Sequence, residues 1–284
     1  MSNTYVVDQS FDESITTSYF LSIRSSSDGL SFSVLDPVVN NYIAFVHLPF
    51  NDQSKEGIKT QEALLTEKLL QFSYKKVLFM LDSNKATLVP TALYDPAKKG
   101  DLFKLNHNIE LEDVELQVQK IKMADAWNIF SVPKFLYHLA KTQFESISFY
   151  QHYSPFVETC LLSSLNNKQK SIIHIGIHAD FFDIVVLESR KLKLCNSFKY
   201  NNVNDFIYFV LYTFEQLELA SNSTTVLMHG INDRQNTLYQ NLKKYLRQTQ
   251  IAPLSYHFNY SSGLKISESD KQIEHNLFNL AICV

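Results

Sequence analysis

The chain contains one pattern of alternating apolar and polar residues twice, at an offset of 152 residues. Tyr19–Asp36 and Ser171–Glu188 each predict a strand, a tight turn near an aspartate, and a returning strand that ends in an acidic residue. The dipeptide Asp28–Gly29 suits the first turn, because glycine accepts a positive φ without a Cβ clash. A pattern that recurs in this way predicts a fold built from two similar units.

The segments that follow each hairpin correspond as well. Each copy continues with a third strand, a helix and a buried strand, and the second copy adds another helix and a strand near Ile251–Phe258. The second copy therefore predicts the order βββαβαβ. The corresponding segments are Tyr42–Leu48 and Lys191–Phe198 for the third strand, Lys55–Phe72 and a helix capped by Asn204 for the helix, and Lys75–Lys85 and Thr224–Arg234 for the fourth strand.

The order predicts two domains of one α/β class. The first is expected at 1–165 and the second at 171–284, joined by the polar linker Asn166–Lys170. The first copy carries extra residues after its fourth strand. We expect these residues, about 95–164, to form a subdomain inserted into the first half.

Three meandering strands followed by parallel strands with helical crossovers resemble the ribonuclease-H-like topology. Two such units in one chain are similar to the actin, Hsp70 and sugar-kinase superfamily, which includes bacterial pilus-assembly and division proteins. The chain is most similar to a bacterial family of unknown function with an actin-like ATPase fold. Leu21–Asp36 (LSIRSSSDGLSFSVLD), Thr87–Asp95 (TLVPTALYD) and His275–Val284 (HNLFNLAICV) carry this resemblance.

The resemblance implies an ATP and Mg²⁺ site between the halves, with a D-x-G-like motif in the first hairpin of each half. The matching triplet of the first half, Ser22–Arg24, has neither the acid nor the glycine. His174–Gly176 of the second half keeps only the glycine. Phosphoryl transfer depends on positioning and charge neutralisation, so we expect no catalytic residues and no hydrolysis.

ATP with Mg²⁺ remains the cofactor to consider, although none is expected. The residues expected to contact a retained nucleotide are Gly176, His178 and Gly230. Gly230 follows His229 at the turn where the superfamily has paired glycines. The opposing interpretation is that single glycines at strand ends are turn residues and that the site is empty or closed.

Histidines offer a second hypothesis. His174, His178 and His229 are expected near one another if the fourth strand lies beside the first, and three imidazoles can bind Zn²⁺. Protonated, they could bind phosphate instead. Asp180 and Asp183 are the carboxylates available to support such a metal site, although Asp180 also suits the hairpin turn. The alternative is that each histidine fills or caps a strand end and is hydrogen-bonded to backbone.

Composition limits the function classes. The net charge of −3 offers no basic stripe for nucleic acid. Three separated cysteines fit a reducing cytoplasm, and no apolar run approaches the ~18 residues that span a bilayer. The aromatic stretch Phe149–Tyr153 is either core or an exposed patch. The sequence leaves the oligomeric state open.

We therefore expect a non-catalytic binding or scaffold protein on a degenerate actin-like frame. The resemblance implies an unknown protein partner that docks on the inserted subdomain. An ATP-binding protein with weak or cryptic ATPase activity is the alternative. A metal-dependent hydrolase would depend on the three histidines alone.

Overall fold

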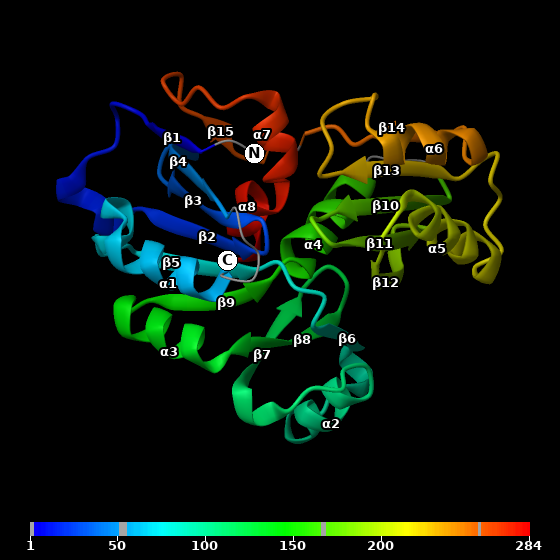
Figure 1. The fold of residues 1–284 in the computed structure, drawn as a ribbon, viewed down its shortest axis with the longest axis horizontal. Coiled ribbons are helices and arrows are strands. Elements are labelled where there is room, and N and C mark those ends of the chain that lie inside the picture. Colours follow the sequence, from blue (N-terminus) through cyan, green and yellow to red (C-terminus); the bar gives the residue numbers. More distant parts are fainter. Residues whose placement is uncertain (1–2, 51–55, 166–168, 255–256) are drawn as a thin grey trace. The chain divides into compact units, whose positions relative to one another are not determined.

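A computed structural model of the chain describes residues 3–50, 56–165, 169–254 and 257–284. It contains two compact units, each with one copy of the repeat (Figure 1). The first unit comprises Met1–Pro155, Tyr256–Ile266 and Asn276–Val284, and the second comprises Phe156–Ser255 and Ser267–His275.

These units differ from the expected halves, 1–165 and 171–284. The second unit begins within helix α4 (Tyr153–Ser164), because the ring of Phe156 packs closely against Gly176 of the second unit. The last residues of the chain belong to the first unit rather than the second. There Leu277 and Phe278 share an apolar cluster with Tyr42, whose hydroxyl donates to the Phe278 carbonyl at 2.7 Å.

The sheet of the first unit has the strand order β1-β4-β3-β2-β5-β9, and β15 pairs with β4. The meander β2-β3-β4 is antiparallel. Strand β5 pairs in parallel with β2, and β9 pairs in parallel with β5. The strands are β1 (Thr4–Val7), β2 (Phe20–Ser26), β3 (Gly29–Asp36), β4 (Asn41–Pro49), β5 (Lys76–Leu81), β9 (Ile147–Gln151) and β15 (Asn259–Tyr260).

The sheet of the second unit has the order β12-β11-β10-β13-β14, which repeats β4-β3-β2-β5-β9 strand for strand. The repeat predicted from the sequence is therefore present as a duplicated ribonuclease-H-like sheet. The strands are β10 (Ser171–Ile177), β11 (Phe181–Glu188), β12 (Lys191–Lys199), β13 (Thr225–His229) and β14 (Thr249–Ile251).

The register of the hairpins is also duplicated. Phe20 lies opposite Leu35, and Ile172 lies opposite Leu187 at the same offset of 152. A β-bulge interrupts the next strand pair immediately before Leu35 and again immediately before Leu187. Because a slip of one residue would turn every apolar side chain to the other face, this agreement shows that both copies obey the same burial pattern.

Helical crossovers complete each unit. Helix α5 (Val203–Gln216) begins after Asn202, whose side chain accepts hydrogen bonds from two backbone amides. The expected N-cap, Asn204, is instead one of those amide donors. Further helices are α1 (Glu56–Thr66), α3 (Lys134–Gln143), α6 (Thr237–Tyr245), α7 (Glu268–Ile273) and α8 (His275–Asn279), and a 3₁₀ turn spans Lys68–Gln71.

Some sequence predictions fall partly outside the described residues. These are the first residue of the predicted helix, Lys55, the linker positions 166–168, and positions 255–256 of the predicted last strand. The prediction was wrong in position: the strand, β14, ends at Ile251 where the predicted strand begins, and residues 252–254 and 257–258 lie outside any strand. Among the described helices, none combines the length and the apolar character needed to cross a bilayer.

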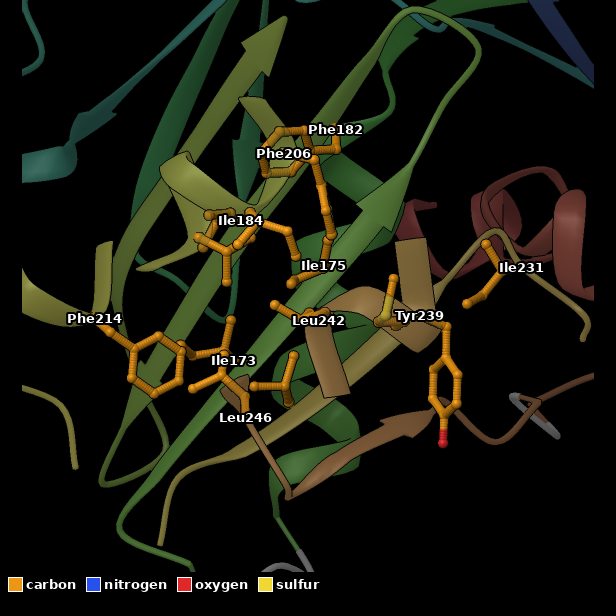
Figure 2. Close-up of a cluster of buried hydrophobic side chains, with 14 of the residues drawn as sticks. Ile173, Ile175, Phe182, Ile184, Phe206, Phe214, Ile231, Tyr239, Leu242 and Leu246 are labelled. Carbon is orange, nitrogen blue, oxygen red and sulfur yellow. The ribbon is translucent and has the colours of Figure 1, made fainter. Parts of the chain in front are cut away.

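The core of the second unit lies between β10, β11 and the helices α5 and α6 (Figure 2). Ile173 and Ile175 point into this cluster beside Phe206 and Leu242, all of them buried. Side chains alternate along a strand, so the intervening His174 faces the opposite side of the sheet. This alternation separates the apolar core from the polar residues considered below.

The inserted subdomain is smaller than expected. It is a three-stranded sheet of order β6-β8-β7 with the short helix α2 (Lys99–Lys104). The predicted insert of about 95–164 also contained α3 and β9, which belong to the duplicated unit because β9 pairs in parallel with β5. The insert strands are β6 (Ala86–Pro90), β7 (Val114–Ile121) and β8 (Ala126–Pro133).

Candidate functional site

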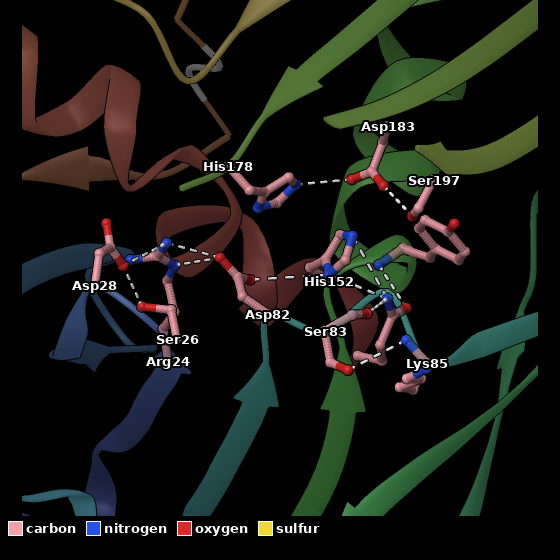
Figure 3. A network of polar contacts seen from close by, with 12 residues as sticks. Arg24, Ser26, Asp28, Asp82, Ser83, Lys85, His152, His178, Asp183 and Ser197 are labelled. Atoms are coloured by element: carbon pink, nitrogen blue, oxygen red, sulfur yellow. Dashed lines mark hydrogen bonds and ion pairs between the residues drawn. The ribbon is translucent and has the colours of Figure 1, made fainter. Parts of the chain in front are cut away.

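A buried ion pair joins the carboxyl ends of β2 and β5 in the first unit (Figure 3). Nε and Nη2 of Arg24 each lie 2.7 Å from Oδ2 of Asp82, the residue that directly follows β5. The two side chains are 6% and 3% exposed. Such a pair is stable only when both charges stay matched, because neither can be resolvated by water.

The turn of the first hairpin satisfies its own polar groups. The Ser26 hydroxyl donates to the Asp28 carboxylate and lies 2.8 Å from the Gly29 carbonyl. Asp28 also lies 3.5 Å from Nη2 of Arg24. Ser22, which the sequence alignment placed at the acid of the superfamily motif, is fully buried in the middle of β2, opposite Ser33.

The corresponding hairpin of the second unit carries a different network (Figure 3). His178 Nε2 lies 2.7 Å from Oδ2 of Asp183, and the Ser197 hydroxyl donates to Oδ1 of the same carboxylate. Asp183 is fully buried on β11, opposite Ser197 on β12. Both carboxylate oxygens therefore have side-chain partners within the unit.

The two glycines expected to approach a nucleotide each have a packing role. A Cβ at Gly176 would lie 3.1 Å from the ring of Phe156, so the space beside this glycine is filled by an aromatic side chain. Gly230 has φ +78°, and a Cβ there would lie 2.4 Å from the Ile177 carbonyl oxygen. The backbone itself thus requires glycine at position 230.

A histidine pair lies on the face of the second sheet that carries α4. His174 Nδ1 is 3.0 Å from His229 Nε2, and both residues are buried. Burial lowers the pKa of His174 to about 4 and holds the pKa of His229 well below its usual value. Both imidazoles are therefore neutral at physiological pH.

Of the three histidines predicted as metal ligands, His174 and His229 come together and His178 contacts Asp183 instead. The third member of the cluster is Cys160 of α4. One candidate ligand atom from each of Cys160, His174 and His229 lies within 4.8 Å of the other two. Such N and S donors suit a transition metal, and Zn²⁺ most directly.

Sequence reasoning missed three of these residues. Asp82 ends a buried strand, and that position was a detectable signal. Ser197 was recognisable only through its cross-strand register with Asp183. Cys160 lies on helix α4 and His174 on strand β10, and no rule of sequence spacing connects the two. The stretch Phe149–Tyr153, left open as core or patch, is core, because each of its described residues is buried.

A protein with an actin-like ATPase fold and unknown function from Bacteroides thetaiotaomicron matches with a TM-score of 0.79 at 25% identity, covering 94% of this chain and 98% of that one. A chain of a PilM–PilN type IV pilus biogenesis complex matches with a TM-score of 0.58 at 11% identity, covering 92% of this chain and 96% of that one. No curated protein matches.

The similarity to the Bacteroides protein and to the chain of the pilus complex confirms the fold predicted from the repeat. A family model described as "Protein of unknown function (DUF3822)" matches residues 8–249, which is most of the chain. The chain therefore belongs to the DUF3822 family and has the actin-like ATPase fold.

Proposed function

We propose that this chain is a non-catalytic protein that uses an actin-like ATPase frame to bind a protein partner. The observation that carries the proposal is the buried ion pair between Arg24 and Asp82. It places a cation, already matched by a carboxylate, at the end of the first hairpin strand, where the superfamily motif would supply groups for Mg²⁺ and phosphate.

A divalent cation has little to bind at this position. Mg²⁺ needs carboxylate or water oxygens in near-octahedral geometry, and Oδ2 of Asp82 is already held by the guanidinium of Arg24. The ion pair therefore disfavours the metal that phosphoryl transfer requires.

Arg24 is equally poorly placed to act as a phosphate ligand. Its side chain is almost wholly buried and its guanidinium is shared between Asp82 and Asp28. A phosphate would have to displace carboxylates that already neutralise this charge. The second hairpin offers no replacement, because Phe156 fills the space beside Gly176 and Asp183 is bonded to His178 and Ser197.

Partner binding is supported by the use of the fold elsewhere. A chain with a similar fold is part of a PilM–PilN type IV pilus biogenesis complex. This chain exposes several large apolar side chains to solvent in the second unit, among them Tyr208 (61%), Tyr212 (44%) and Tyr245 (59%). Tyrosines of this kind contribute strongly to protein interfaces, because they bury a large area at a small entropic cost.

The first test is calorimetric titration of the full chain with ATP and Mg²⁺, combined with thermal unfolding and phosphate release. We expect no saturable heat, no shift in the melting temperature and no release above a buffer control. Saturable binding without turnover would support the alternative of an ATP-binding protein with cryptic activity. ATP turnover by the wild type that is abolished by a substitution which leaves the chain folded would overturn the proposal.

A further inference from the structure

A cysteine and two histidines from three separate elements meet in the second unit. They are Cys160 on α4, His174 on β10 and His229 at the end of β13, with exposed fractions of 0%, 1% and 8%. We propose that these three side chains bind one Zn²⁺ ion as a structural site of this unit. No part of the proposed binding function depends on this metal.

The spacing of the donors suits a metal. Zinc binds sulfur at about 2.3 Å and imidazole nitrogen at about 2.0–2.1 Å in a tetrahedron, so neighbouring donor atoms are about 3.3–3.8 Å apart. Here the candidate donors lie within 4.8 Å of one another, and His174 Nδ1 is 3.0 Å from His229 Nε2. Small side-chain rotations convert one arrangement into the other.

His174 gives an independent reason to expect a ligand. Its Nε2 is buried and has no hydrogen-bond partner among the described residues. A buried polar atom left unsatisfied costs about 1–3 kcal/mol. A metal bound through Nε2 of His174 would satisfy this atom.

The charges in the site can balance. Binding replaces the thiol proton of Cys160 with the metal, giving a zinc thiolate and one proton released to solvent. Burial raises the pKa of the Cys160 thiol well above its usual value, and the charge of Asp183 adds to this effect. Bound Zn²⁺ with one thiolate carries a charge of +1, and the same Asp183 carboxylate would offset it.

A fourth position is available close to the cluster. The rings of His275 and His229 have centroids 5.3 Å apart. His275 Nδ1 lies 3.0 Å from the Gln272 carbonyl, a contact that fixes the ring so that Nε2 carries the lone pair. Water or this nitrogen would complete the tetrahedron. The burial of all three principal donors favours a structural role over a catalytic one.

Cobalt titration tests the proposal directly. The full-length chain is stripped with a chelator under reducing conditions and titrated with Co²⁺. We expect one equivalent to bind, with the intense visible bands of a tetrahedral ion and a thiolate-to-cobalt charge-transfer band, and Zn²⁺ should abolish both. Absence of binding, or an octahedral spectrum without the charge-transfer band, would overturn the proposal.

Variants identify the donors. Cys160→Ser, His174→Gln and His229→Gln should each weaken Co²⁺ binding by more than about 100-fold. Cys283→Ser and His138→Gln, which alter the same residue types in the first unit, should leave the affinity unchanged. His178→Gln should also leave it unchanged, which separates this cluster from a three-histidine site. Equal affinity in the wild type and the Cys160→Ser variant would refute the assignment.

Thermal unfolding of the wild type tests the proposal even if the variants fail to fold. Zn²⁺ binds the folded chain and should raise the melting temperature of the wild type, with a dependence on free Zn²⁺ that follows its affinity. The chelator should reverse the increase. An unchanged melting temperature across the titration would contradict a structural metal.

Discussion

The ends of the two hairpins show how far the copies have diverged. In the first unit, Arg24 near the end of β2 pairs with Asp82. At the offset of 152 the position of Arg24 is occupied by Gly176, against which Phe156 packs. The register of the strands is the same in both copies, yet one strand end holds a buried charge pair and the other an aromatic contact.

A second pair of equivalent positions differs in a similar way. Ser31 on β3 hydrogen-bonds to His47 across the sheet at 2.8 Å, whereas Asp183 at the matching place on β11 binds Ser197. Both pairs are directly opposite in the ladder. The comparison teaches that packing of the apolar core keeps the strand register the same in both copies. The polar side chains near the hairpin ends can change without altering that register.

The largest expected effect comes from breaking the charge pair of the first unit. Asp82→Asn leaves the Arg24 guanidinium buried without its main carboxylate, so the free energy of unfolding should fall by about 3–5 kcal/mol. Urea unfolding measures it. Asp28→Asn, which removes the more exposed and more distant carboxylate, should cost less than about 1 kcal/mol. Equal losses would mean that Asp82 is not the principal partner.

The turn after β13 in the second unit should owe its stability to the backbone conformation of Gly230. Gly230→Ala introduces a Cβ at a positive φ and against the Ile177 carbonyl oxygen. We expect the free energy of unfolding to fall by about 3 kcal/mol, from left-handed strain and the close contact together. Leu81, the matching residue after the offset of 149, is the control: Leu81→Met should cost less than about 1.5 kcal/mol. A tolerated Gly230→Ala would show that the turn relaxes.

A pH dependence should distinguish the second unit. The pKa of His174 is about 4 in the folded chain, below its unfolded value of about 6.5. The neutral ring therefore contributes stability that is complete above about pH 6.5 and is lost as the pH falls towards 4. Metal-free chain should lose about 2 kcal/mol more than His174→Gln between about pH 7 and pH 5. Parallel pH profiles would contradict the burial of this imidazole.

The smallest effect is expected where Phe156 packs. A Cβ at Gly176 meets the edge of the Phe156 ring, and a side chain can shift more easily than backbone. Gly176→Ala should therefore lower the free energy of unfolding by about 1 kcal/mol. Gly176→Ala combined with Phe156→Leu should recover part of that loss. A double variant no better than the sum of the two single changes would exclude this contact as the cause.

Much of the fold was predictable from local patterns. The hairpins, the fourth strand of each copy and helix α5 follow from alternation or helical spacing in the sequence. The first half was harder to divide, because α3 and β9 follow the insert in sequence and only the pairing of β9 with β5 assigns them to the duplicated unit. Periodicity identifies a strand, but not the neighbour with which it pairs.

The candidate sites were predictable only in part. His174 and His229 were expected together, because parallel neighbours in this topology bring β10 and β13 side by side. Cys160 could not be placed, since the packing of α4 on the opposite face of the sheet depends on contacts distant in sequence. The ion pair of Arg24 with Asp82 has the same origin, as its members are 58 residues apart.

The sequence by itself determined that this protein repeats one βββαβαβ unit, because side-chain alternation and turn residues are local properties that recur at a fixed offset. Tertiary structure alone decided what the strand ends do. It decided that an arginine is neutralised by a distant aspartate, that a phenylalanine fills the space beside a glycine, and that a cysteine joins two histidines. These contacts depend on which faces of separate elements meet, and that is settled only when the core within each unit packs.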